Sequence, residues 1–286
     1  MSVALRSAFV DFLLDCKVRR LAPRTIEFYE RTAAPFVAGD LNGNLPAALR
    51  AHLAELTHLA PATQAMHARG IGIFLRWCER EGYLEKAPRV PAPKVPQAIK
   101  RTLSEAEVAR LLAAGHTLRD ACMLRVLLDS GLRREELVAL DWRDADMAQG
   151  ILTVRNGKGG KGRQSVVSPA TCAMLQRLRG DASEAAPVFR NYRGDRLEAQ
   201  GVRSVVARAG SKAGLGPLGT HCLRRTCATR LLQIGWPLEL VSRQLGHSQI
   251  GTTLKFYARV DTGNLIEAGK RCGWGDRRNL LPEQAC

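Results

Sequence analysis

A histidine and two arginines stand together in Thr220-His221-Cys222-Leu223-Arg224-Arg225. Because His221 and Arg224 are three residues apart, a helix would place both on one face. A guanidinium binds a phosphate through paired hydrogen bonds, and an imidazole beside it can move a proton near neutral pH. The segment therefore predicts chemistry on a phosphate, although each residue alone could equally be surface charge or a core histidine.

Two other segments carry side chains of related chemistry. His247 follows in Leu245-Gly246-His247, and ten residues later Tyr257 stands in GTTLKFYARV. Upstream, SGLRREELVAL places Arg133 after a glycine, with Glu136 one helical turn later. A tyrosine can act as a nucleophile that forms a covalent intermediate, so these segments add a candidate nucleophile to the phosphate-binding groups.

The segment 156–163, NGKGGKGR, formally matches a dinucleotide-binding glycine motif. That motif needs a helix directly after its glycines, whereas the residues that follow, QSVVS, are typical of a strand. A Walker A motif would need Lys and then Ser or Thr after Gly162, where the chain has Arg163-Gln164. We therefore predict a β-hairpin whose tip presents Lys158, Lys161 and Arg163, either to solvent or to phosphate.

Taken in order, these segments resemble the tyrosine recombinases, the Xer and phage integrase family. SGLRREELVAL resembles the first-arginine box, the glycine-rich hairpin the lysine-bearing turn, and HCLRRTCATRLLQIG the H-x-L-R box. LGHS resembles the second-histidine box and TTLKFY the nucleophile box. The resemblance covers about residues 102–262. One departure is Arg259, since many members have a histidine two residues after the tyrosine. The implied catalytic set is Arg133, Lys158, His221, Arg224, His247 and Tyr257.

The resemblance implies that Tyr257 attacks a DNA phosphodiester, giving a 3′-phosphotyrosyl link and a free 5′-hydroxyl. Arg133 and Arg224 would bind the non-bridging oxygens and stabilise the charge that develops in the transition state. Lys158 would protonate the departing 5′-oxygen, and His221 would serve in acid–base catalysis.

The remaining residues would have supporting roles. His247 would hydrogen-bond the phosphate, and Glu136 would orient Arg133 and His221. The residues expected to bind DNA are Lys161, Arg163 and Arg225.

The same chemistry limits the cofactors and partners. Because the phosphotyrosyl link conserves the energy of the phosphodiester, we expect no cofactor, neither ATP nor a metal. The expected partners are double-stranded DNA recombination sites, further copies of the chain in a tetramer on DNA, and possible accessory recombinases or DNA-bending proteins. No membrane is involved in this interpretation.

The elements that must position these residues are mainly helical. Apolar periodicity predicts N-terminal helices over 3–19, 24–37, 45–56 and 63–81. Further helices are expected over 105–114, 118–130 and 135–140, the first opened by the capping box Ser104-x-x-Glu107. From Gly201 onward the pattern is helical again, including 220–234, 238–245 and 252–260. Strands are expected over 151–155 and 164–168. The predicted fold is mainly α with a small β-sheet, an N-terminal helical bundle (a SAM-like core-binding domain) followed by an α+β tyrosine recombinase catalytic domain.

A proline-rich stretch divides the chain. Residues 87–100, APRVPAPKVPQAIK, contain four prolines, which is typical of a stiff, extended connector. We predict a helical DNA-binding domain over 1–90, a linker over 91–101 and a catalytic domain over 102–286.

Composition agrees with a polyanionic partner. The 286 residues contain 43 Lys and Arg against 27 Asp and Glu, a net charge of +16, and the sequence pI is about 10.1. No apolar run is long enough for a transmembrane helix. The eight cysteines form no C-x-x-C pair, which favours reduced thiols in a cytoplasmic protein and argues against a zinc site.

Two alternatives remain at this point. The segment 237–257, PLELVSRQLGHSQIGTTLKFY, could be a helix-turn-helix in a DNA-binding regulator without catalysis, with Gly246 in the turn. That alternative gives Arg133 and the lysine hairpin no role. A type IB topoisomerase would share the tyrosine chemistry, but the short hairpin and short C-terminal segment favour a recombinase.

Overall fold

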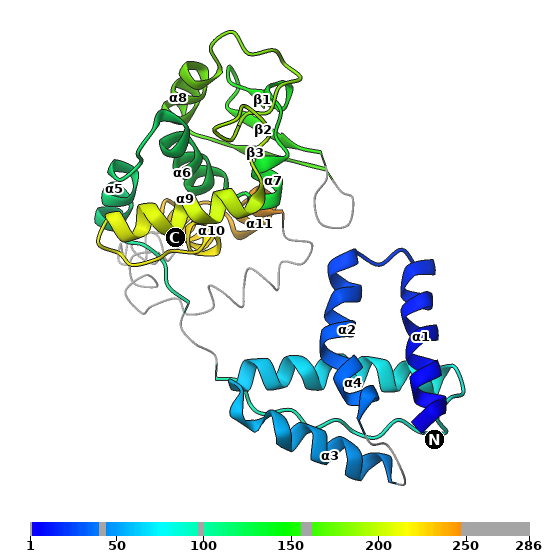
Figure 1. Cartoon of the computed structure of the whole chain (residues 1–286). Helices are drawn as coiled ribbons and strands as arrows, with labels where there is room; N and C mark the ends of the chain where they lie inside the picture. The colour runs from blue at the N-terminus through cyan, green and yellow to red at the C-terminus, as the bar shows by residue number, and fades with distance from the viewer. Residues whose placement is uncertain (1, 40–43, 97–99, 156–161, 247–286) are drawn as a thin grey trace, which may run out of the picture. The chain divides into compact units, whose positions relative to one another are not determined.

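The computed structural model describes residues 2–39, 44–96, 100–155 and 162–246 (Figure 1). The chain forms two compact units, Met1–Ile99 (unit 1) and Lys100–Cys286 (unit 2). The proline-rich stretch is not wholly separate from unit 1, because Ala87 and Val90 pack against the unit 1 core.

Unit 1 is a helical bundle. Its helices are α1 (Ser2–Val18), α2 (Pro23–Ala38), α3 (Leu45–Glu55) and α4 (Pro61–Arg80), with a short 3-10 turn η1 (Leu56–His58). The four expected helices are confirmed, with small shifts at their ends. Helices α2 to α4 each have a proline in their first two positions, where its missing N–H costs no helical hydrogen bond.

Aromatic rings fill the core of unit 1. The ring of Phe12 lies 5.0 Å from that of Tyr29 and 5.4 Å from that of Trp77, measured between centroids. Phe9 and Phe74 meet edge to face at 5.2 Å. Such tilted contacts suit the quadrupoles of the rings, so helices α1, α2 and α4 are held by one aromatic cluster.

Unit 2 contains the remaining described helices. They are α5 (Glu105–Ala113), α6 (Leu118–Ser130), α7 (Arg134–Val138), α8 (Pro169–Arg179), α9 (Ala199–Lys212), α10 (Thr220–Gln233) and α11 (Leu238–Leu245), with a 3-10 turn η2 (Trp142–Asp144). The capping box at Ser104 is present as expected: its hydroxyl accepts from the N–H of Glu107, whose carboxylate accepts from the N–H of Ser104. Helix α8 was not predicted, although Ser168-Pro169 is a typical helix start.

A three-stranded antiparallel sheet completes the described part of unit 2. The strands are β1 (Ala145–Asp146), β2 (Ile151–Val154) and β3 (Arg163–Val166), in the order β1-β2-β3. Val154 pairs with Arg163, so the predicted hairpin is confirmed. The expected fold class, mainly helical with a small sheet, is also confirmed.

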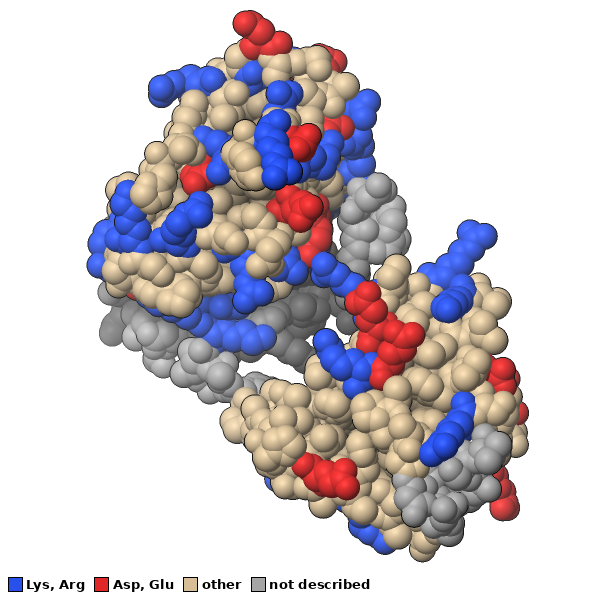
Figure 2. Space-filling model, in the orientation of Figure 1, with Lys and Arg blue, Asp and Glu red and all other residues tan. Residues whose placement is uncertain are grey.

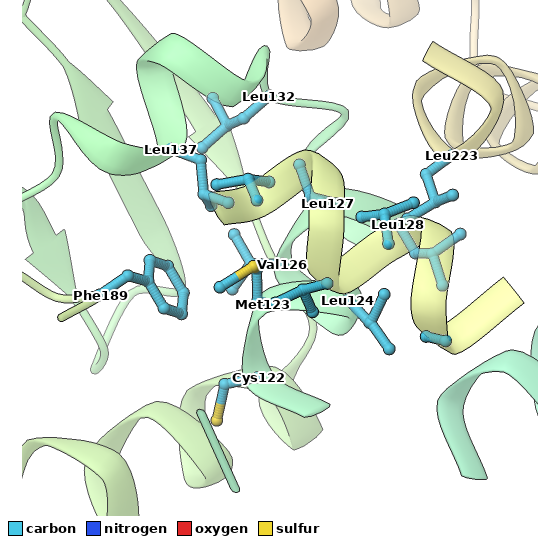
Figure 3. Close-up of a cluster of buried hydrophobic side chains, with 14 of the residues drawn as sticks. Cys122, Met123, Leu124, Val126, Leu127, Leu128, Leu132, Leu137, Phe189 and Leu223 are labelled. Atoms are coloured by element: carbon cyan, nitrogen blue, oxygen red, sulfur yellow. The ribbon is translucent and has the colours of Figure 1, made fainter. Parts of the chain in front are cut away.

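Helix α6 runs through the core of unit 2. Its residues Met123, Leu124 and Leu127 are fully buried. Figure 3 shows them among side chains from several elements, including Leu137 of α7 and Leu223 of α10. This packing fixes α7 and α10 against α6, and so determines where the polar residues at their ends can lie.

The first residues of unit 2 are bonded to α10. The N–H of Leu103 donates to the hydroxyl of Thr226 at 3.0 Å. The carbonyl of Arg101 accepts from Nε of Arg225 at 3.1 Å. The chain therefore enters unit 2 alongside the helix that carries His221 and Arg224.

Within the four described ranges, no helix is both long and apolar enough to cross a membrane.

Candidate active site

A glycine turn at the end of α6 begins the site. Gly131 has φ +60°, the left-handed conformation that commonly ends a helix. A Cβ on Gly131 would lie 2.4 Å from Cδ2 of Leu245, so only glycine allows α11 to approach so closely. Arg133 follows as the residue that precedes α7. The end of α6, the start of α7 and the end of α11 therefore meet at one point.

Glu136 binds Arg133 twice. Its Oε1 accepts from Nη1 of Arg133 at 2.7 Å, and its Oε2 accepts from the backbone N–H of Arg133 at 2.7 Å. Since the Glu136 side chain is 5% exposed, the guanidinium of Arg133 is held by a buried carboxylate. No hydrogen bond from Glu136 to His221 is found within the described part of the chain, so Glu136 has the expected geometry toward Arg133 only.

Arg163 lies elsewhere than we expected. We predicted it at a hairpin tip as a DNA contact, but it is the first residue of β3 and its side chain is only 12% exposed. Nη1 and Nη2 donate to Oε1 and Oε2 of Glu136 at 2.7 and 2.8 Å, a bidentate pair. Its Nε points to the carbonyl of Gln244 at 3.5 Å. The side chain of Arg163 is therefore directed towards α7 and α11, while its backbone pairs with Val154 in the sheet.

Arg224 is the most buried of the arginines, at 7% exposure. Its Nη1 donates to the carbonyl of Gly131, and its Nη2 donates to the carbonyl of Leu245 at 2.6 Å. These carbonyls stand at the C-terminal ends of α6 and α11, where helices leave carbonyl oxygens without partners and favour a positive charge. Arg224 thus joins the two helix ends beside Arg133.

The guanidinium cluster, as we call it, consists of three arginines and one carboxylate: Arg133, Arg163, Arg224 and Glu136. Burial alone would raise the pKa of Glu136, but hydrogen bonds from Arg163 and Arg133 hold it at about 2. Burial, and the charges of Arg133 and Arg163, lower the pKa of Arg224 to about 10. Glu136 and Arg224 are therefore both charged at pH 7, and three guanidinium groups face one carboxylate. Such a surplus of positive charge at a partly buried site favours binding of an anionic ligand.

His221 lies near this cluster, in the first turn of α10. Partial burial, and the charges of Arg224, Arg225 and Arg134, lower its pKa, while Glu135 raises it. The imidazole is therefore neutral at pH 7 and able to accept a proton. The carboxylate whose charge raises that pKa is Glu135.

The expected DNA-binding residue Arg225 follows Arg224 on α10 and is half-buried. Its Nε is directed to the carbonyl of Arg101. The described contact therefore fixes the start of unit 2.

Gln244 is a residue that the sequence did not reveal. Its Oε1 accepts from the N–H of Val166 at 2.9 Å, and its Nε2 donates to the carbonyls of Val166 at 2.8 Å and Asp129 at 3.1 Å. It ties the end of α11 to β3 and α6. The left-handed Gly246, φ +67°, follows as the helix cap and was visible in the sequence as a glycine after an amphipathic helix.

The other expected site residues, Lys158, Lys161, His247 and Tyr257, lie outside the described residues, as does the helix expected over 252–260. Among the residues that the structure does describe, no group of three or more His, Cys, Asp or Glu side chains could hold a metal ion.

A second cluster of arginines and carboxylates, which we call the aspartate cluster, lies at η2 and β2. Asp141 is 3% exposed and accepts from Arg155, Arg196 and Arg143 at 2.7, 2.5 and 3.2 Å. Asp144 pairs with Arg155 at 2.8 Å. Burial would raise the pKa of Asp141, but its hydrogen bonds from Arg196 and Arg155 hold it at about 2.

Further cations cover the surface. Figure 2 shows Lys and Arg side chains spread over the visible face of unit 2, with smaller groups of acidic residues among them. Phosphate contacts from such a surface would be independent of base sequence.

Comparison with known proteins gives consistent matches. The model of the phage integrase family matches residues 101–263. The tyrosine recombinase XerC of Pelobacter propionicus is 32% identical over 270 residues, which are 87% of this chain and 89% of that protein. The tyrosine recombinase XerA of Pyrococcus horikoshii is 32% identical over 192 residues, 66% of this chain and 67% of that protein.

Solved structures share the fold. An integrase of the Tn1549 transposon in complex with a circular intermediate DNA has a TM-score of 0.74 at 16% identity, covering 94% of this chain and 99% of that one. A lambda integrase dimer bound to a COC′ core site has a TM-score of 0.71 at 17% identity, covering 86% and 95%.

Proposed function

Since the chain belongs to the phage integrase family and is a tyrosine recombinase, an enzyme of site-specific DNA recombination, we propose that it cuts each DNA strand by attack of Tyr257 on a phosphodiester. The phenol oxygen forms a bond to phosphorus, the bond from phosphorus to the 5′-oxygen breaks, and a 3′-phosphotyrosyl link results. A 5′-hydroxyl of another strand then reverses these steps and reseals the DNA. No energy source is needed, because one phosphodiester replaces another.

The surplus of buried cations carries this proposal. Arg133 and Arg224 stand together beside a single carboxylate, and a phosphodiester would supply the missing negative charge. Their N–H groups are held by Glu136 and by helix-end carbonyls, so little reorganisation is required when charge develops on the phosphate oxygens. These two arginines are the donors that stabilise the transition state.

Proton transfer falls to His221 and Lys158. His221, whose pKa is lowered, is neutral at pH 7 and can take the proton of Tyr257. Lys158 gives a proton to the departing 5′-oxygen. His247 hydrogen-bonds the phosphate, and Lys161 and Arg225 contribute to DNA binding.

Double-stranded DNA recombination sites are the proposed substrate. The transposon and lambda integrases with the same fold were solved with DNA. Unit 1 serves as a core-binding domain that contacts the DNA, joined by the proline-rich linker to the catalytic unit. The working assembly is a tetramer on DNA in the cytoplasm, with an accessory recombinase or DNA-bending protein as a further partner. The regulator alternative gives the guanidinium cluster no role.

Covalent capture tests the proposal. The wild-type protein is incubated with a pool of nicked duplexes of randomised sequence, and adducts that resist denaturing detergent are recovered, amplified and sequenced. Tyr257→Phe should retain DNA affinity and form no adduct, because it lacks the nucleophilic oxygen. Tyr192→Phe is the matched control, since this tyrosine is 86% exposed and should not affect capture. Adducts that persist in Tyr257→Phe would refute the assignment of the nucleophile.

A further inference from the structure

Arg163 connects three parts of unit 2 through one side chain. Both oxygens of Glu136, on α7, accept from its Nη atoms. Its Nε is directed to the carbonyl of Gln244, on α11. Its own backbone belongs to β3, paired with Val154 of β2. The side chain therefore joins α7, α11 and the hairpin.

Gly246 shows how closely the end of α11 approaches this arginine. A Cβ on Gly246 would lie 2.5 Å from Cδ, 2.6 Å from Nε and 2.8 Å from Cζ of Arg163. The backbone at Gly246 thus lies against the guanidinium. The carbonyl of the same glycine accepts from Nη2 of Arg133 at 3.3 Å. Arg163 and Arg133 consequently hold one short stretch of backbone from two directions.

The charges explain why a second arginine is needed here. Each oxygen of Glu136 accepts one hydrogen bond from Arg133 and one from Arg163. A buried carboxylate with Arg133 as its only cation would compete with a phosphate for that guanidinium. Arg163 supplies a second positive charge to Glu136 from the side of the sheet, so the charge of Arg133 is less fully neutralised.

We propose that Arg163 is a positioning residue for cleavage. It neutralises Glu136, so that Arg133 stays both oriented and cationic toward the phosphate, and it fixes the end of α11 against the hairpin. This inference rests on the proposed function of the site. At 12% exposure and with its donors directed inward, Arg163 acts through Glu136 and not through contact with DNA.

The test uses the full-length chain and one nicked duplex recovered by covalent capture on the wild type. Variants Arg163→Met, Glu136→Gln and the double variant are compared by the rate of adduct formation at saturating protein and by DNA affinity. Arg119→Met is the matched control, because Arg119 also binds a buried carboxylate, Asp120, with its Nε and Nη2, at the opposite end of α6.

We expect Arg163→Met to slow adduct formation about 100-fold, because an unneutralised Glu136 would hold Arg133 away from its role as a transition-state donor, with DNA affinity nearly unchanged. The double variant should react no more slowly than Arg163→Met, because without the carboxylate there is no charge left to neutralise. Arg119→Met should react at the wild-type rate.

Several results would overturn the inference. These are a wild-type rate in Arg163→Met, a loss expressed wholly in DNA affinity, or a double variant whose loss is the product of the two single losses. If the wild type formed no adduct at all, the proposed function would be overturned as well. Failure of the inference about Arg163 can therefore be distinguished from failure of the proposed function.

Arg163→Lys is a second variant that keeps the test valid if Arg163→Met fails to fold. A lysine keeps the charge but cannot make the bidentate pair. It should melt near the wild-type temperature and restore part, but not all, of the rate lost in Arg163→Met. A rate equal to that of Arg163→Met in a folded Arg163→Lys protein would contradict the neutralising role.

Discussion

The guanidinium cluster and the aspartate cluster of unit 2 each join three arginines to buried carboxylates, but only the guanidinium cluster buries arginines as well. In the guanidinium cluster, Arg224 and Arg163 are 7% and 12% exposed and outnumber a single carboxylate. In the aspartate cluster, Asp141 and Asp144 are buried, while their arginines are 41% to 54% exposed.

The difference separates a binding site from a structural junction. Exposed guanidiniums are hydrated, so the aspartate cluster needs no additional anion and serves to hold η2 to β2 and to the segment before α9. Buried guanidiniums in excess lack that hydration, so the guanidinium cluster is completed when an anion binds. Equivalent substitutions in the two clusters should therefore have unequal effects.

The largest effect is expected for Arg224→Lys. An ammonium cannot donate to the carbonyls of both Gly131 and Leu245 while also facing a phosphate. Adduct formation should fall about 1,000-fold, and stability should fall by about 1–3 kcal/mol for the carbonyl left without a donor. Adduct kinetics on the captured duplex and urea unfolding measure the two quantities. If Arg224→Lys cleaved DNA at the wild-type rate, the guanidinium cluster would be a structural junction like the aspartate cluster and not a binding site.

Acid titration compares the carboxylates directly. Glu136 and Asp141 both have folded pKa values of about 2, below their ordinary values, so each contributes stability above its unfolded pKa and loses it as pH falls toward 2. For Glu136 this contribution is about 3 kcal/mol. Unfolding free energies measured between pH 5 and pH 2 should decrease steeply in the wild type and less steeply in Glu136→Gln. If the unfolding free energy of Glu136→Gln fell with pH as steeply as that of the wild type, groups other than Glu136 would account for the acid sensitivity.

Gly246→Ala should have the next largest effect. Its left-handed φ costs an alanine about 1–2 kcal/mol, and the new Cβ would collide with Arg163. Gly216→Ala is the control, because it has φ +71° and no atom within 4 Å of its Cβ. Urea unfolding should show a larger loss for Gly246→Ala than for Gly216→Ala, with slower adduct formation only in the former. Equal losses would mean that the contact with Arg163 is unimportant.

The smallest effect is expected for Arg196→Gln in the aspartate cluster. Arg196 is 41% exposed, and Asp141 keeps Arg155 and Arg143 as partners. Stability should fall by at most about 1 kcal/mol, with no change in adduct formation. A large loss of activity would show that this cluster, too, belongs to the reaction.

Local signals in the sequence predicted most helices and the hairpin. The capping box at Ser104, the apolar periodicity of the N-terminal helices and the β-rich residues of β2 and β3 each depend on a few neighbouring residues. Helix α8 was missed, although its start at Ser168-Pro169 is equally local. The two-residue strand β1 offers too few residues for an alternating pattern.

The candidate site was predictable in its residue types but not in its partners. Arg133, Glu136 and Arg224 could be identified from their spacing and their resemblance to a family. The pairing of Arg163 with Glu136 joins residues 27 apart, and it depends on the register of the sheet and the packing of α11. Gln244, which bonds Val166 and Asp129, is likewise determined by tertiary packing alone. Because Arg163 is basic and follows a glycine-rich segment, the sequence suggested that it contacts DNA. The fold instead directs its side chain inward.

The side chain of Gln244 also covers part of an open edge of the sheet. Its amide makes with Val166 the two hydrogen bonds that the backbone of a neighbouring strand would make. Strand β3 lies at the outer side of the described sheet, and an open edge of this kind is a template for pairing between molecules. Because Gln244 of α11 occupies those groups, we expect strand addition to be blocked at that point.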